Sequence, residues 1–215
     1  MLAVRHTKQP DTPRRRHPYW VQLDVAGDLY GLDDLCRVTG LDRPESPAAL
    51  TRLGERFRDA VLLPRELPAL LATHEFARRG RSRELLKEEK KLALARDWRA
   101  LVAPSRRVGG HLLSQLRPLR DERIVQRFLD AHCAGRTPGF HLTVLGVTSA
   151  LFHVPPRQVL WDYALTLLDG LALTAGQRLR LAAPTRQAIV RNISQPIPPK
   201  LGSMLDESDF GVKIA

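Results

Sequence analysis

Apolar residues recur three or four positions apart along most of this chain, and Pro or Gly interrupts the pattern between successive runs. This spacing places the apolar side chains on one face of an α-helix. Ser46 and Pro47 form a typical helix start, because a serine oxygen can cap the first turn and proline there loses no hydrogen bond. Leu50, Leu53 and Phe57 then follow at helical spacing. No run alternates as a strand would, so the sequence predicts an all-α fold.

Starts and stops of this kind predict a single-domain bundle of about eight helices. Pro64, Pro104 and Pro118 are expected to end helices, because proline lacks the backbone N–H that a helix interior needs. The predicted helices span residues 29–38, 46–61, 67–80, 82–102, 105–116, 121–135, 140–154 and 155–174, and a last amphipathic turn or two spans 185–193. The helix at 140–154 is apolar nearly all round and contains small residues such as Gly146, so we expect it to be buried and closely approached by another helix.

The two ends of the chain differ in composition from the helical part. Residues 1–18 are basic and interrupted by prolines, so they cannot bury enough apolar area to order themselves, and we expect a flexible arm. Residues 19–195 form the predicted all-α domain, in which 19–23 could be an extended segment. Residues 196–215 are proline-rich and then acidic, and we expect an irregular tail there.

The charge of the chain is strongly positive. A formal net charge of +11 results from 34 Lys and Arg residues against 23 Asp and Glu residues. Such a balance favours an acidic partner, which includes nucleic acid, an anionic membrane surface or an acidic protein. Charge alone does not select among these, so a basic helical nucleic-acid-binding or regulatory protein stays an alternative.

Cysteine use and hydropathy indicate a cytoplasmic protein. Cys36 and Cys133 are far apart and form no metal-binding pair. The N-terminal residues lack the apolar core of a secretory signal. The most apolar stretch, 159–175, is interrupted by Asp162 and Asp169 and is shorter than the roughly 20 apolar residues that span a membrane. We therefore expect no membrane contact.

Sequence motifs for catalysis are absent. The chain has no GxxxxGK[ST] phosphate-binding loop, no HExxH, no CxxC pair and no GxSxG. We therefore expect no enzyme activity, no catalytic residue and no cofactor. His111, His141 and His153 lie on different predicted helices, and packing could bring two of them together as a metal pair. The more frequent role of such histidines is a satisfied core or surface position, so no metal ligand is predicted.

Two local features favour contact with a partner. Arg106 and Arg107 lie near a predicted helix start, where cations oppose the helix dipole, so they fit an acidic partner as well as a solvated face. Residues 33–41, with Gly40 in the turn, and the helix that follows Ser46 have some character of a helix-turn-helix. The link between them is long and no clear recognition helix follows, so DNA reading is the weaker interpretation.

Several segments match one known family in order and spacing. The matching segments are 66–70, 100–113, 141–155 and 175–179, followed by Gln187. Within the second, Ser105, Gly109, Leu112 and Leu113 fit a Ser-x-x-x-Gly-x-x-Leu-Leu pattern, and the third contains a Leu-Gly pair and a run of small residues. These segments resemble the urease accessory protein F family over about residues 46–195. The family's signatures at the two termini are not found.

The resemblance implies a non-enzymatic maturation factor, a chaperone-like scaffold for urease. It would bind a second accessory protein of the D/H type, recruit the accessory GTPase and support nickel insertion into apo-urease, and it could form a homodimer. The residues that we expect to contact partners are Arg106, Arg107, Arg178, Asp206 and Phe210.

Overall fold

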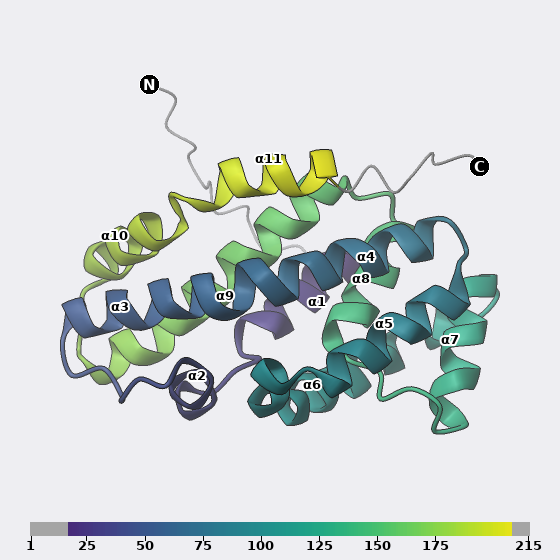
Figure 1. Ribbon diagram of the computed structural model, residues 1–215, viewed down its shortest axis with the longest axis horizontal. Coiled ribbons are helices and arrows are strands. Elements are labelled where there is room, and N and C mark those ends of the chain that lie inside the picture. The colour runs from purple at the N-terminus through teal and green to yellow at the C-terminus, as the bar shows by residue number, and fades with distance from the viewer. Residues whose placement is uncertain (1–16, 208–215) are drawn as a thin grey trace, which may run out of the picture.

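The computed structural model describes residues 17–207, and within them every regular element is helical (Figure 1). The elements are α1 (Pro18–Gly27), α2 (Leu32–Thr39), α3 (Pro47–Phe57), η1 (Arg58–Glu66), α4 (Leu67–Arg78), α5 (Ser82–Leu94), η2 (Arg96–Leu101), α6 (Val102–Gln115), η3 (Arg117–Leu119), α7 (Arg123–Cys133), α8 (His141–Leu151), α9 (Pro156–Arg178), α10 (Ala183–Ser194) and α11 (Ile197–Glu207). The predicted all-α fold is confirmed, and the predicted helices correspond to α2 through α10.

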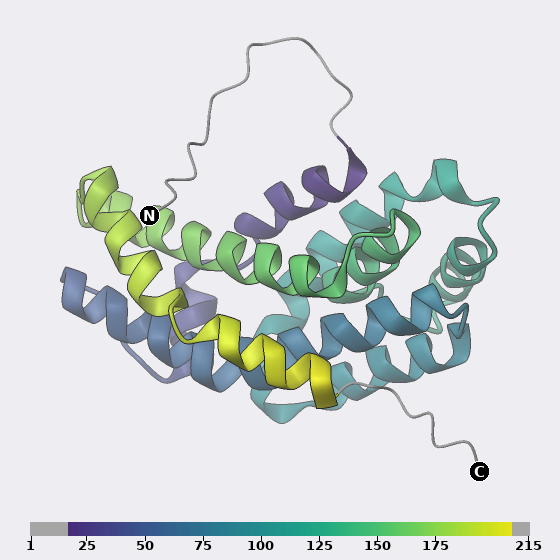
Figure 2. The same cartoon turned by 90° about the horizontal axis from the view of Figure 1, so that it is seen from above.

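The core is built around α8, as its apolar sequence predicts. Every residue from His141 to Ala150 is buried, and α8 packs against α4, α6 and α1. Gly146 makes the closest of these approaches possible, because a Cβ there would meet the side chain of Thr73 on α4 and would lie 3.0 Å from the backbone nitrogen of His74. The long helix α9 runs alongside α3 and α4, with α1 on its other side (Figure 2).

Pro64 does not end a helix, contrary to the prediction. The segment α3, η1 and α4 runs as one long rod across the molecule (Figure 1), and Pro64 lies inside η1, which is a π-helix. A π-helix bonds each N–H to the carbonyl five residues earlier and has a wider turn than an α-helix. We attribute the tolerance of Pro64 to this wider turn, which relieves the clash of the ring with the preceding turn.

Pro104 also has a different role from the predicted one. The helix expected to reach residue 102 ends at Leu94, and the short helix η2 follows it. Pro104 lies in the first turn of α6, where the missing N–H has no partner to lose. The prediction took Pro104 as the end of one helix, whereas it lies in the first turn of the next. Proline is compatible with both positions, because neither needs its missing N–H.

Both ends of the described region are more ordered than the sequence indicates. Residues 19–23 belong to α1, in which Tyr19 and Leu23 are buried. The tail predicted to be irregular from residue 196 begins instead with α11, which packs on α9 through the buried Ile197 and Leu201. Residues 1–16 of the predicted arm lie outside the described residues.

Candidate partner-binding surface and the buried network beneath it

A chain of polar side chains crosses the core and connects five elements. Ser105 Oγ on α6 lies 2.7 Å from His141 Nδ1, and His141 Nε2 lies 2.7 Å from the hydroxyl of Tyr163 on α9. Tyr163 donates to Glu66 Oε2 in η1 at 3.1 Å. Trp98 Nε1 in η2 donates to Glu66 Oε1 at 3.0 Å, and Tyr30, which precedes α2, donates to the same oxygen. We call these six residues the buried network.

The direction of each hydrogen bond in the buried network can be assigned. Tyr163 donates its proton to Glu66, so it must accept from Nε2 of His141. The other ring nitrogen, Nδ1, then accepts from Ser105, and His141 is neutral. Burial lowers the pKa of His141 to about 3, in agreement with this tautomer. Burial raises the pKa of Glu66, and hydrogen bonds from Tyr30, Trp98 and Tyr163 oppose that rise.

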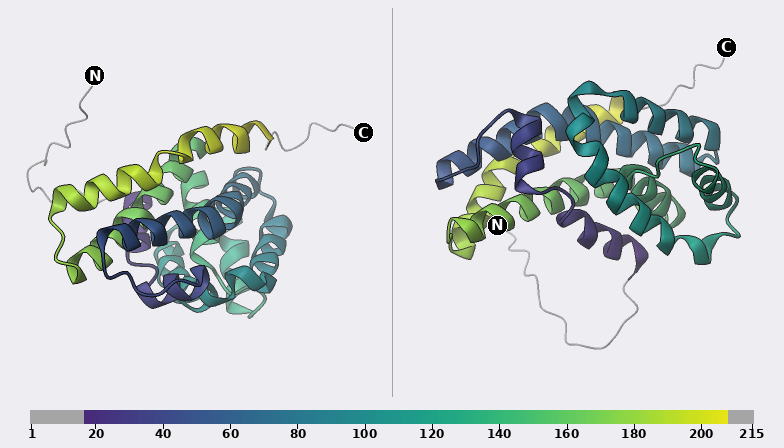
Figure 3. Two further views of the ribbon diagram at one scale, coloured as in Figure 1. Left: turned by 60° about the vertical axis from the view of Figure 1, so that its left-hand side comes forward. Right: turned by 90° about the horizontal axis from the view of Figure 1, so that it is seen from below.

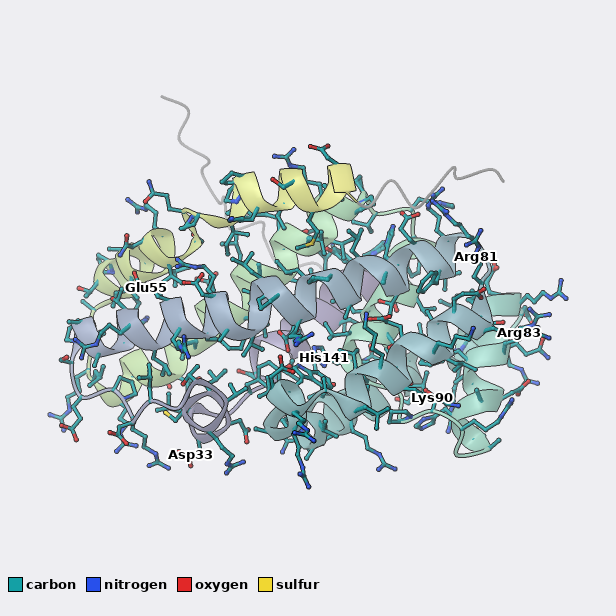
Figure 4. The ribbon with its side chains drawn as sticks, viewed as in Figure 1. Asp33, Glu55, Arg81, Arg83, Lys90 and His141 are labelled. Carbon is teal, nitrogen blue, oxygen red and sulfur yellow. The ribbon has the colours of Figure 1, made fainter. Side chains whose placement is uncertain are left out.

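The serine, histidine and carboxylate of the buried network do not form a catalytic site. A nucleophile must meet its substrate, yet Ser105, His141, Tyr163 and Glu66 are all 0 % exposed. Such fully satisfied buried polar groups fix the relative positions of the elements that carry them. The buried network therefore links α6, α8 and α9 to the long rod, and we call it the joint. Its member His141 lies near the centre of the molecule in Figure 4.

The buried network fixes which side of α6 faces the solvent. Ser105 points into the core, whereas the next two residues, Arg106 and Arg107, are exposed. Within residues 17–207, neither arginine forms an ion pair with an acidic side chain. The structure thus presents two adjacent cations on a helix whose position is fixed from inside.

Arg178 lies at the end of α9 and is exposed. It is close enough to lower the pKa of Asp33 on α2, although Arg43 lowers that pKa more. The helix α2 packs against η2, which leads into α6, and both α2 and α6 lie on the face seen from below (Figure 3, right). The helix α6 and the C-terminal end of α9 both lie toward the lower edge of Figure 1. We call the three exposed arginines that these elements carry, Arg106, Arg107 and Arg178, the basic face.

Asp206 and Phe210 do not join the basic face. Asp206 is exposed on α11, which lies at the upper edge of Figure 1, whereas α6 lies at the lower edge. Phe210 lies outside the described residues. The five residues expected to contact partners thus divide into three on the basic face, one on the opposite side and one without a described position.

The described residues contain no cluster of three or more His, Cys, Asp or Glu side chains that could hold a metal ion. His141 does not meet another histidine, because Ser105 and Tyr163 occupy both of its ring nitrogens. Among the helices of residues 17–207, none combines the length and the hydrophobicity that a membrane-spanning segment requires.

The region with helix-turn-helix character contributes its apolar residues to the hydrophobic core. Leu35 of α2 and Leu50, Leu53 and Phe57 of α3 are all buried. The helix α3 is also the first part of the long rod and packs against α9 and α10. These contacts account for the helical spacing of the apolar residues without any need for a DNA-reading helix.

Glu89 on α5 forms a second buried polar contact that the sequence did not indicate. Its carboxylate accepts hydrogen bonds from the backbone N–H of Phe140 at 2.6 Å and of Gly139 at 3.2 Å, at the start of α8. A carboxylate at a helix N-terminus is favourable, because the free N–H groups there carry partial positive charge. Burial nevertheless raises the pKa of Glu89 to about 7.

The raised pKa of Glu89 predicts a pH dependence of stability. The folded protein binds this proton more tightly than the unfolded chain does, so the contribution of Glu89 to the unfolding free energy falls as the pH rises from about 4.5 to about 7. Glu89→Gln lacks this titration. The unfolding free energy of the variant relative to wild type should therefore increase between about pH 5 and pH 7, by at most about 3 kcal/mol. Urea unfolding of wild type and variant at both pH values measures this difference in unfolding free energy. The same difference at pH 5 and pH 7 would contradict the prediction.

The fold and these sites define a class of protein. It is an all-α scaffold with a buried polar network in its core and exposed arginines on its surface. Residues 45–192 match the model of the UreF family. The chain therefore belongs to the UreF family, and the resemblance drawn from its motifs is confirmed. This membership implies a urease accessory function. A search of curated proteins found no match to the chain.

Proposed function

We propose that this chain is a non-enzymatic scaffold for urease maturation in the cytoplasm. It binds an accessory protein of the D/H type, recruits the accessory GTPase and supports the insertion of nickel, as cargo, into apo-urease. The observation that carries the proposal is the match of residues 45–192 to the UreF family. The exposed arginines of the basic face, fixed by the buried joint, are the proposed contact to an acidic surface of a partner.

A co-purification experiment tests this function. The full chain is expressed with the D/H-type accessory protein and the GTPase, and the affinity-purified material is examined for a complex that survives size-exclusion chromatography. A stable complex and higher urease activity in cells that contain the chain are expected. Absence of any complex, together with salt-sensitive binding to DNA or RNA, would instead favour the nucleic-acid alternative, because phosphate neutralisation gives a steep salt dependence.

Charge reversal on the basic face is expected to abolish or strongly weaken this complex. Arg106→Glu with Arg107→Glu replaces two cations by two anions, and like charges across an interface cost several kcal/mol. Both side chains are exposed, so the fold should persist. The measurement is the amount of partner retained in the co-purification.

The matched control for this charge reversal is Arg52→Glu with Arg56→Glu on α3. These two arginines are also exposed, and the change in net charge is the same, but they lie outside the basic face. The control should retain the partner. Equal loss in both double variants would show that total charge, and not the basic face, governs the complex.

A further inference from the structure

A second group of arginines lines a hollow at the N-terminal end of α5. The hollow has a volume of about 510 Å³ and lies where α5, α7 and the segment after α7 meet. We call it the basic pocket. Its lining residues are Gly80, Arg81, Ser82, Arg83, Glu84, Leu86, Arg127, Asp130 and Arg136. Figure 4 labels Arg81 and Arg83 at this end of the molecule.

The charges of the basic pocket are unbalanced. Four arginines line it against two carboxylates, those of Glu84 and Asp130. Within residues 17–207, none of the four arginines forms an ion pair with these or any other acidic side chains. Guanidinium groups that line one hollow repel one another, and an anion between them would relieve that repulsion. The pocket therefore carries a positive charge that the protein itself does not neutralise.

The backbone adds donors to the same place. The helix α5 begins at Ser82, directly at the basic pocket, and no side chain caps it. The N–H of Ser82 donates to the carbonyl of Gly80 at 3.1 Å, whereas the next N–H groups of the first turn lack acceptors within the helix. The N-terminus of a helix also favours negative charge. Arg127 on α7 reaches the hydroxyl of Ser82 at 3.4 Å, so the donors of the two helices converge.

We propose that the basic pocket binds a phosphate group, either inorganic phosphate or the phosphate of a small-molecule ester. Several guanidinium forks, a serine hydroxyl and helix N–H groups offer more donors than one carboxylate can accept, whereas a phosphate presents three or four oxygens in different directions. A helix N-terminus with arginines is a typical arrangement for phosphate. The volume is larger than phosphate alone requires and lies within the range of small-molecule sites.

The experiment is a titration of the isotope-labelled full chain, followed by nuclear magnetic resonance and calorimetry. The probes are sodium phosphate, pyrophosphate and glycerol 3-phosphate, each compared with sodium chloride at equal ionic strength. We expect saturable shifts of the amide signals of Arg83 and Glu84 with the phosphates and not with chloride. Tighter binding of glycerol 3-phosphate than of inorganic phosphate would assign an ester, and the reverse order would assign free phosphate.

Two double variants distinguish binding in the basic pocket from a general effect of net charge. Arg83→Gln with Arg127→Gln should weaken phosphate binding at least about tenfold, because hydrogen bonds to charged groups contribute more than neutral ones. Arg52→Gln with Arg56→Gln removes the same charge from exposed positions on α3 and should leave the affinity unchanged. The proposal is overturned if no probe gives a saturable shift, if both double variants weaken binding equally, or if an Asp- and Glu-rich peptide binds here while the phosphates do not.

Discussion

Replacing Gly109 by alanine is expected to lower the unfolding free energy by about 3 kcal/mol or more, at the upper end of the usual effect of overpacking. Gly109 on α6 faces the backbone that leads into α8. A Cβ at this position would overlap the carbonyl oxygen of Gly139 and lie 2.6 Å from the nitrogen of His141. These are backbone atoms at the start of a buried helix, so they cannot move aside as a flexible side chain would.

The neighbouring glycine provides the control for this prediction. A Cβ at Gly110 meets nothing within 4 Å, although Gly110 lies in the same helix. Gly110→Ala should therefore raise the unfolding free energy by about 0.5–1 kcal/mol, because alanine loses less backbone entropy in a helix. Urea unfolding of both variants measures the contrast. Similar stabilities for the two would show that α6 does not approach α8 as closely as the structure indicates.

Removal of the Glu66 side chain is expected to have an effect of similar size. Glu66→Ala leaves Tyr30, Trp98 and Tyr163 without their acceptor in a site where all three are buried. Each unsatisfied buried donor costs about 1–3 kcal/mol, so a loss of about 3 kcal/mol or more is expected. Thermal unfolding measures the loss, and the near-ultraviolet circular dichroism of the indole should change with it.

A milder variant of the same network keeps this prediction testable if Glu66→Ala does not fold. Tyr30→Phe removes one donor and leaves Glu66 with two, so no buried donor becomes unsatisfied and the expected cost is about 1 kcal/mol. If Glu66→Ala cost no more than Tyr30→Phe, the carboxylate would not be the centre of the network.

The helices and their core faces were largely predictable because their signals are local. Spacing of apolar residues and helix-starting residues such as Ser46 act within a few positions, and the structure confirms the cap that Ser46 provides to the N–H of Ala49. The errors arose where a local rule has two outcomes. Pro64 can end an α-helix or sit in a π-helix, and the choice depends on how the long rod packs. The helix α11 was missed because Pro198 and Pro199 indicate an irregular segment, although proline is tolerated in a first helical turn and α11 is held by packing on α9.

The buried network was not predictable, because its members are distant in sequence. Glu66 and Tyr163 are separated by 97 positions, and Ser105 and His141 by 36. One signal was present in the sequence: Glu66 lies four positions after Leu62 and four before Leu70, on the apolar face of a helical pattern. A carboxylate in such a place requires donors, and the aromatic residues with hydroxyl or N–H groups were the candidates. The charged residues of the basic face were identified individually, but only the fold shows that the end of α9 and the helix α6 lie toward the same edge of the molecule.

The adjacency of Ser105 and Arg106 has a consequence for the energetics of association. A surface that must be ordered when a partner arrives loses conformational entropy at that moment, and affinity falls accordingly. On α6 the backbone part of that ordering has already taken place during folding, since Ser105, hydrogen-bonded to His141, and the exposed arginines share one turn of helix. Docking on this helix should therefore resemble rigid-body association, with little change of backbone between the free and bound states.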